Sequence, residues 1–179
     1  ALVRSRRTWV LIDRDRGLLA TEGSVAAKAE AVLESLRGAL GSLPIAPLRF
    51  ENPLDGVLTR WLMADPLPAG FSLGQWADLE HPLDRANKVR FRGQDLDEAE
   101  VHATLERGLR VTALELHYQL TDDAAVSFVL DEEGVIKRLR LPEADDDSPA
   151  EDAAAALDAH LALLAPTLGK LIDALLPAE

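Results

Sequence analysis

The sequence predicts an α+β fold built mostly from antiparallel sheets with packed helices, and three observations support this prediction. Residues 88–92 alternate cationic and apolar side chains, which is the period of a strand with one buried face. Three more alternating segments follow with short polar links between them, as antiparallel hairpins require: residues 110–118, 125–130 and 135–141. Between the first strand and these three, residues 97–108 carry the start and stop signals of a helix.

Residues 1–64 are expected to form an N-terminal ββαβα sub-domain. Its elements in chain order are two hairpin strands, a helix, a third strand and a second helix: residues 8–13, 17–21, 25–40, 48–50 and 54–64. Ser24 can cap the first helix, whose apolar residues recur at the spacing of one helix face, and Gly41 ends it. The prolines of residues 65–68 stop the second helix.

Residues 65–142 are expected to form a second sub-domain, in which a strand and a helix precede a three-strand meander. Residues 71–80 add an irregular strand ahead of these elements. Asp97 can cap the helix, and Glu100 occupies the reciprocal position of a capping box. Gly108 follows the last turn, where a left-handed residue commonly terminates a helix.

Residues 143–179 are expected to form an acidic linker followed by C-terminal helices. After Leu157, leucines continue at alternating steps of three and four residues, as in a helical seam: Leu161, Leu164, Leu168, Leu171 and Leu175. Pro166 interrupts this seam, which favours a kinked helix or two short helices. The leucines can pack within their own subunit, or they can form the interface of a homodimer.

The net charge of the 179-residue chain is −12, which by itself argues against a polyanionic partner. The acids are unevenly distributed, however, because residues 143–179 hold nine acids and only one lysine. The chain has no cysteine, which removes disulfides and thiolate chemistry. No apolar run approaches the roughly 18–20 residues that cross a bilayer. We therefore expect a cytoplasmic protein without a membrane segment.

No pattern of catalytic or metal-binding residues is found in the sequence. The four histidines share no metal-ligand spacing: His81, His102, His117 and His160. The acidic runs at residues 131–133 and 145–147 fall in a turn and in the linker, whereas a two-metal site needs carboxylates on rigid neighbouring elements. We expect no enzyme, no cofactor and no bound metal.

Cationic strand faces are the remaining candidates for function. Lys88, Arg90 and Arg92 share one side of their strand, with neighbouring cations about 6.5–7 Å apart, which matches the scale of successive phosphates. Arg138 and Arg140 form a second pair opposite the leucines of their strand. The alternative is an ordinary charged sheet face that is neutralised by nearby acids such as Asp95 and Glu98.

Several motifs occur in the order found in one protein family. They are GSLPIAPL at 41–48, ENP at 51–53, LTRW at 58–61, RGQDL at 92–96, VTAL at 111–114, VSFV at 126–129 and IKRLRL at 136–141. Together they span nearly the whole chain, which resembles the C-terminal part of RdgC, the recombination-associated protein of proteobacteria. The chain begins at Ala1 rather than at a methionine, so we expect it to be part of a longer protein.

The resemblance implies nonspecific binding of double-stranded DNA by a ring-shaped homodimer that restricts the access of RecA to DNA. It places Arg90, Arg92 and Gln94 along the DNA path and the protein on the nucleoid. Gly93 departs from the family, in which many members carry a basic residue before the glutamine. The competing function is a protein-interaction or dimerisation module with neither catalysis nor DNA affinity of its own.

Overall fold

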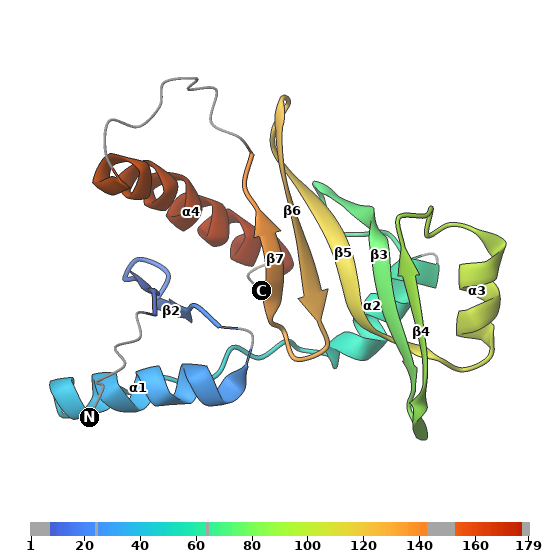
Figure 1. Ribbon diagram of the computed structural model, residues 1–179, viewed down its shortest axis with the longest axis horizontal. Helices are drawn as coiled ribbons and strands as arrows, with labels where there is room; N and C mark the ends of the chain where they lie inside the picture. Colours follow the sequence, from blue (N-terminus) through green and yellow to red (C-terminus); the bar gives the residue numbers. More distant parts are fainter. Residues whose placement is uncertain (1–7, 24, 64, 143–152, 177–179) are drawn as a thin grey trace. The chain divides into compact units, whose positions relative to one another are not determined.

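The computed structural model describes residues 8–23, 25–63, 65–142 and 153–176 (Figure 1). The expected cap at Ser24 and the expected acidic linker at 143–152 therefore lie outside the described residues. The chain divides into two compact units, Ala1–Leu48 and Arg49–Glu179. Helices and antiparallel sheets occur together in the chain, which confirms the α+β prediction.

The first unit consists of a hairpin and one helix, as predicted. Strand β1 (Val10–Asp13) pairs with β2 (Leu18–Thr21), and α1 (Ala26–Leu40) ends at Gly41, whose φ is +76°. The Asp13 carboxylate accepts the Arg16 backbone N–H at 3.1 Å and the Arg16 guanidinium at 2.9 Å, and these bonds lower the pKa of Asp13. None of the described residues of this unit is buried.

The predicted strand at residues 48–50 is wrong. Residues 42–50 form neither helix nor strand, and no strand pairs with them among the described residues. The physical reason is local, because Pro44 and Pro47 lack the N–H donors that a sheet ladder uses.

A five-stranded antiparallel sheet forms the centre of the second unit, with strand order β4-β3-β5-β6-β7 (Figure 1). Its strands are β3 (Phe71–His81), β4 (Asp84–Arg92), β5 (Arg110–Thr121), β6 (Ala124–Asp131) and β7 (Ile136–Arg140). The strand predicted at 71–80, the strand at 88–92 and the three-strand meander are confirmed.

One face of this sheet carries the hydrophobic core. Leucines of α2 (Leu54–Met63) pack there with buried residues of the strands, including Leu58, Leu79, Leu114 and Phe128. Helix α2, which the sequence placed with the N-terminal segment, thus contributes its apolar side to the second unit. The core covers the apolar face of the sheet, so the opposite face is the one available to bind a ligand.

Helix α3 (Ala99–Glu106) begins one residue later than its sequence indicates, because the predicted N-cap was Asp97. Its N-cap residue is Glu98 and no side chain caps it, so the predicted capping box is wrong. The Asp97 backbone N–H instead donates to the Asp95 carboxylate at 3.0 Å, because an Asx turn competes with helix entry. Gly108 has a φ of +92°, which confirms the predicted left-handed terminator.

Helix α4 (Ala153–Leu175) is a single helix that contains Pro166, so the two-helix alternative is wrong. Proline removes one hydrogen bond at a cost of about 3 kcal/mol, and burial of the following turn offsets part of that cost. Thr167 and Leu171 are buried there, and Leu171 belongs to the core of its own chain. No helix within the described ranges combines the length and apolar character needed to traverse a bilayer.

The seam leucines differ in burial along α4. Leu171 and Leu175 pack on the core, and Leu164 and Leu168 are half-buried. Leu161 is exposed, as are Leu157 and Leu163. The C-terminal half of the seam therefore has an intramolecular role, while a dimer contact by the exposed half stays a prediction.

A buried hydroxyl links α2 to the sheet. Thr59 Oγ1 donates to the Asp55 carbonyl at 2.6 Å and accepts the Val111 backbone N–H at 2.9 Å. Thr59 and Val111 are both buried, so water cannot replace the hydroxyl.

We expect Thr59→Val to destabilise the protein by about 1–3 kcal/mol, because it leaves a buried N–H without an acceptor. The melting temperature should fall by roughly 2–4 °C per kcal/mol for a chain of this size. Thr104→Val is the matched control, because the Thr104 hydroxyl is also buried but bonds only the Glu100 carbonyl of its own helix. Equal losses in the two variants, measured by thermal denaturation, would contradict this role of Thr59.

Candidate nucleic-acid interface

The face of the sheet opposite the core is charged. Ala77, Leu79 and Phe91 point into the core, so the residues between them point the other way. Three cross-strand pairs of β3 and β4 lie on that face: Trp76 with Arg92, Asp78 with Arg90, and Glu80 with Lys88. The prediction that Lys88, Arg90 and Arg92 share one face is confirmed.

Carboxylates from β3 accompany these cations. Lys88 Nζ lies 2.7 Å from Glu80 Oε2, and Arg92 Nη2 lies 3.1 Å from Asp78 Oδ1. Arg90 Nε is 3.9 Å from the same Asp78 oxygen. Partial neutralisation of this face therefore comes from Asp78 and Glu80, whereas the sequence suggested Asp95 and Glu98. Lys88 and Arg90 are exposed while their carboxylate partners are half-buried, and ion pairs this open to water contribute about 0–1 kcal/mol, so these two cations can exchange partners.

An irregularity in β7 redirects Arg138. Ser127 pairs with Arg140 but Val129 pairs with Lys137, so β7 has one more residue than β6 between these two points. Arg138 is the extra residue and has a φ of +53°, which no other described non-glycine residue shares in sign. This conformation is uncommon for an arginine and costs roughly 1–2 kcal/mol.

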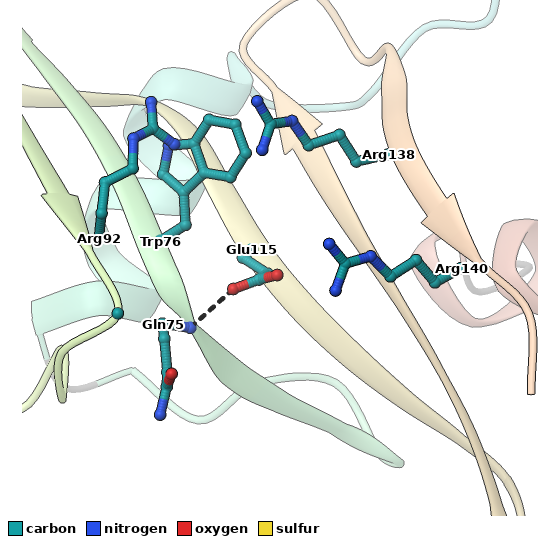
Figure 2. A pocket seen from close by; sticks show the side chains of 7 residues that line it. Gln75, Trp76, Arg92, Glu115, Arg138 and Arg140 are labelled. Atoms are coloured by element: carbon teal, nitrogen blue, oxygen red, sulfur yellow. Dashed lines mark hydrogen bonds between the residues drawn. The ribbon is translucent and has the colours of Figure 1, made fainter.

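Trp76 lies between two guanidinium groups. The Arg92 Cζ is 3.4 Å from the Trp76 ring centroid, and the Arg138 Cζ is 3.6 Å from it. Two groups at van der Waals distance cannot share one face of the ring, so they cover opposite faces (Figure 2). We call this arrangement the guanidinium–indole stack. It joins β4, β3 and β7, although β5 and β6 separate the last two in the sheet.

Asp78 fixes the orientation of the stack. Its Oδ1 accepts the Trp76 indole N–H at 2.8 Å and the Arg92 guanidinium at 3.1 Å. The tryptophan therefore has a hydrogen bond at its edge and cation–π contacts on its faces. These contacts restrict side chains that are otherwise flexible.

A small pocket of about 170 Å³ opens beside the stack (Figure 2). Its lining residues come from four strands and the turn after β4: Gln75, Trp76, Arg92, Gly93, Glu115, Arg138 and Arg140. Arg92, Arg138 and Arg140 are candidates that the sequence predicts, whereas Gln75, Trp76 and Glu115 are pocket residues that it does not predict.

A second irregularity, in the pairing of β3 with β5, places Glu115 in this pocket. Leu73 pairs with Leu116 and Ala77 pairs with Leu114, which leaves extra residues in β3. The Glu115 carboxylate accepts the freed Gln75 N–H at 2.8 Å. A Cβ at Gly74 would lie 2.5 Å from Glu115 Cγ, so a side chain at this position would displace Glu115. A glycine inside a strand was the signal of this irregularity in the sequence.

We call the whole surface the charged face. It consists of Trp76, Asp78, Glu80, Lys88, Arg90, Arg92, Glu115, Arg138 and Arg140.

Gln94 lies beside this surface but does not line the pocket. Its Nε2 atom is buried without a hydrogen-bond partner among the described residues. Its role at DNA stays a prediction. Lys137 forms an ion pair with Asp131, since its Nζ lies 2.6 Å from the Asp131 carboxylate.

The described residues contain no group of three or more histidines and carboxylates placed to hold a metal ion. The acidic run at 145–147 lies outside them.

Comparison with known proteins finds relatives along the full chain. A family model described as "Putative exonuclease, RdgC" matches residues 1–178. The Recombination-associated protein RdgC of Shewanella loihica is 39% identical over 177 residues, which cover 96% of this chain and 57% of the relative. Those of Edwardsiella ictaluri and Yersinia enterocolitica are 38% and 36% identical, over 99% of this chain and 59% of each relative. The chain thus spans less than two thirds of these relatives.

The left-handed backbone of Arg138 gives a stability prediction. Arg138→Gly should be more stable than Arg138→Ala by about 1 kcal/mol, because glycine adopts a positive φ without steric cost. Both variants lose the guanidinium, so their difference, measured by denaturant unfolding, isolates the backbone term.

Arg140 supplies the control, because its φ is not positive. There the order should be reversed, with Arg140→Gly less stable than Arg140→Ala by about 0.5–1 kcal/mol. The same order at both positions would contradict the conformation of Arg138.

Proposed function

The chain belongs to the RdgC family, and on this premise we propose that its charged face binds double-stranded DNA without sequence preference. The relatives are named recombination-associated proteins, and a role in recombination is consistent with a surface for DNA. The observation that carries the proposal is the gathering of cations from β4 and β7 on the one sheet face that the core does not use.

The charge of this face is positive although the chain is anionic. Of the residues that define it, five are cations, Lys88, Arg90, Arg92, Arg138 and Arg140, and three are carboxylates, Asp78, Glu80 and Glu115. The excess among these residues is two positive charges, in a chain whose net charge is −12. A local excess of this kind attracts phosphates even where the total charge does not.

The arrangement suits phosphate contacts better than base reading. The cations of β4 recur every second residue, about 6.5–7 Å apart, which is the scale of phosphate spacing along a strand. Contacts to phosphates position a duplex without reading its bases. Lys88 and Arg90 have exposed side chains and can give up their half-buried carboxylate partners when a phosphate approaches.

The proposal extends to assembly for the whole protein. We propose a ring-shaped homodimer that encloses the duplex on the nucleoid and limits the access of RecA to it. The exposed leucines of α4, Leu157, Leu161 and Leu163, are candidates for the subunit contact. Because the chain spans 57–59% of its relatives, the remainder of the ring is assigned to the rest of the protein.

A charge reversal on β4 tests the DNA site. Arg90→Glu should weaken duplex binding about tenfold and reduce the slope of log K against log salt concentration by roughly 1, because one phosphate contact is lost. Fluorescence anisotropy with a labelled duplex at several salt concentrations measures both quantities. Arg90 is preferable to Arg92 because it is not part of the stack.

Arg60→Glu is the matched control. Arg60 lies on α2, on the core side of the sheet, with 54% of its side chain exposed and an Asp65 carboxylate at 3.2 Å, against 66% exposure for Arg90. Equal effects of the two reversals, or binding that ignores salt, would favour the interaction-module alternative. We propose binding without cleavage, so the duplex should stay intact with added Mg²⁺ or Mn²⁺; shortened DNA would instead support the exonuclease description of the family.

A further inference from the structure

Arg138 and Arg140 differ from the cations of β4 in their surroundings. Lys88, Arg90 and Arg92 each have a carboxylate within 4 Å, whereas neither arginine of β7 forms an ion pair with a described carboxylate. Both arginines line the pocket beside Trp76. Arg138 and Arg140 therefore line the pocket without an ion pair to any described carboxylate.

The stack leaves the Arg138 donors available. A guanidinium that lies flat on an indole uses its π face, while its N–H groups point outward in its own plane. Its position 3.6 Å above Trp76 also fixes the long side chain before any ligand arrives. Figure 2 shows Arg138 and Arg140 extending from β7 toward the same space. A ligand with several acceptor oxygens would meet donors that are already oriented.

The backbone indicates that this orientation is maintained at a cost. Arg138 has a φ of +53° at the irregular point of β7, where glycine or asparagine would be less strained. Strained backbone that persists at a charged pocket is typical of a ligand site. The conformation turns Arg138 toward Trp76, where its guanidinium meets the ring.

We infer that this pocket is a binding site for one phosphodiester group of a nucleic-acid backbone, held by the guanidinium groups of Arg138 and Arg140 beside Trp76. The inference rests on the proposed DNA binding and deepens it, because it makes the β7 arginines the fixed anchor and Lys88 and Arg90 of β4 the exchangeable contacts.

Glu115 sets the charge of the preferred ligand. Arg92 also lines the pocket, but the Asp78 carboxylate 3.1 Å away neutralises its charge. The remaining charged groups, Arg138, Arg140 and Glu115, have a net charge of +1, which balances a phosphodiester with one negative charge. A terminal phosphate monoester carries nearly two charges and would lie beside the Glu115 carboxylate. The bond from the Gln75 N–H keeps that carboxylate in the pocket. The site should therefore prefer internal phosphates to strand ends.

NMR titration with the dinucleotide thymidylyl-(3′,5′)-thymidine tests this site. The signals to follow are the Trp76 indole N–H, which is held by Asp78, and the arginine Nε–H groups. We expect a saturable shift with the dinucleotide and none with thymidine, which lacks the phosphate. Arg140→Gln should raise the dissociation constant about tenfold, as loss of a charge-assisted hydrogen bond does. Arg90→Gln, outside the pocket, is the control.

Further variants sharpen the test. Glu115→Gln, which keeps an acceptor for Gln75, should tighten binding and should favour thymidine 5′-monophosphate more than the dinucleotide. The inference is overturned if the dinucleotide shifts none of these signals, if thymidine shifts them equally, or if Arg90→Gln weakens binding as much as Arg140→Gln. Duplex binding is measured separately: a duplex that binds while the dinucleotide does not would refute the phosphate pocket and leave the proposed function standing.

Discussion

The Asp78 carboxylate is the constraint on which the charged face depends. One of its oxygens accepts both the Trp76 indole N–H and the Arg92 guanidinium, and Arg90 lies 3.9 Å from it. An acid on a surface proposed to bind DNA is explained by this ordering role. Long cationic side chains lose entropy when a ligand immobilises them, and side chains that are already ordered lose less.

The two faces of the sheet divide stability from function. Leu79, Leu114 and Phe128 are committed to the core, which leaves the opposite face free to carry charge. Irregular strand pairing then modifies that face: the extra residues of β3 admit Glu115, and the extra residue of β7 turns Arg138 toward Trp76. The total charge of the chain is a poor guide here, because its acids concentrate in residues 143–179.

Alternation in the sequence was sufficient to predict β4, the meander and the shared face of Lys88, Arg90 and Arg92. It could not identify Asp78 and Glu80 as their partners, because strand register depends on the folded sheet. No sequence signal predicts a positive φ at an arginine, so the contact of Arg138 with Trp76 could not be predicted from the sequence. Gly74 within a strand is a sequence signal of the irregularity in β3, and tertiary packing outweighs the helix-breaking tendency of Pro166.

We propose that DNA approaches the charged face and not the helical side of the sheet. Because the chain has no cysteine, a single introduced cysteine can carry a photo-crosslinker at one defined position. Ser127 pairs with Arg140 on the charged face, and Met63 is exposed on α2 on the other side. We predict that Ser127→Cys crosslinks to a duplex at low salt and that Met63→Cys does not. Crosslinking that is equal at both positions, or stronger at Met63, would contradict the account.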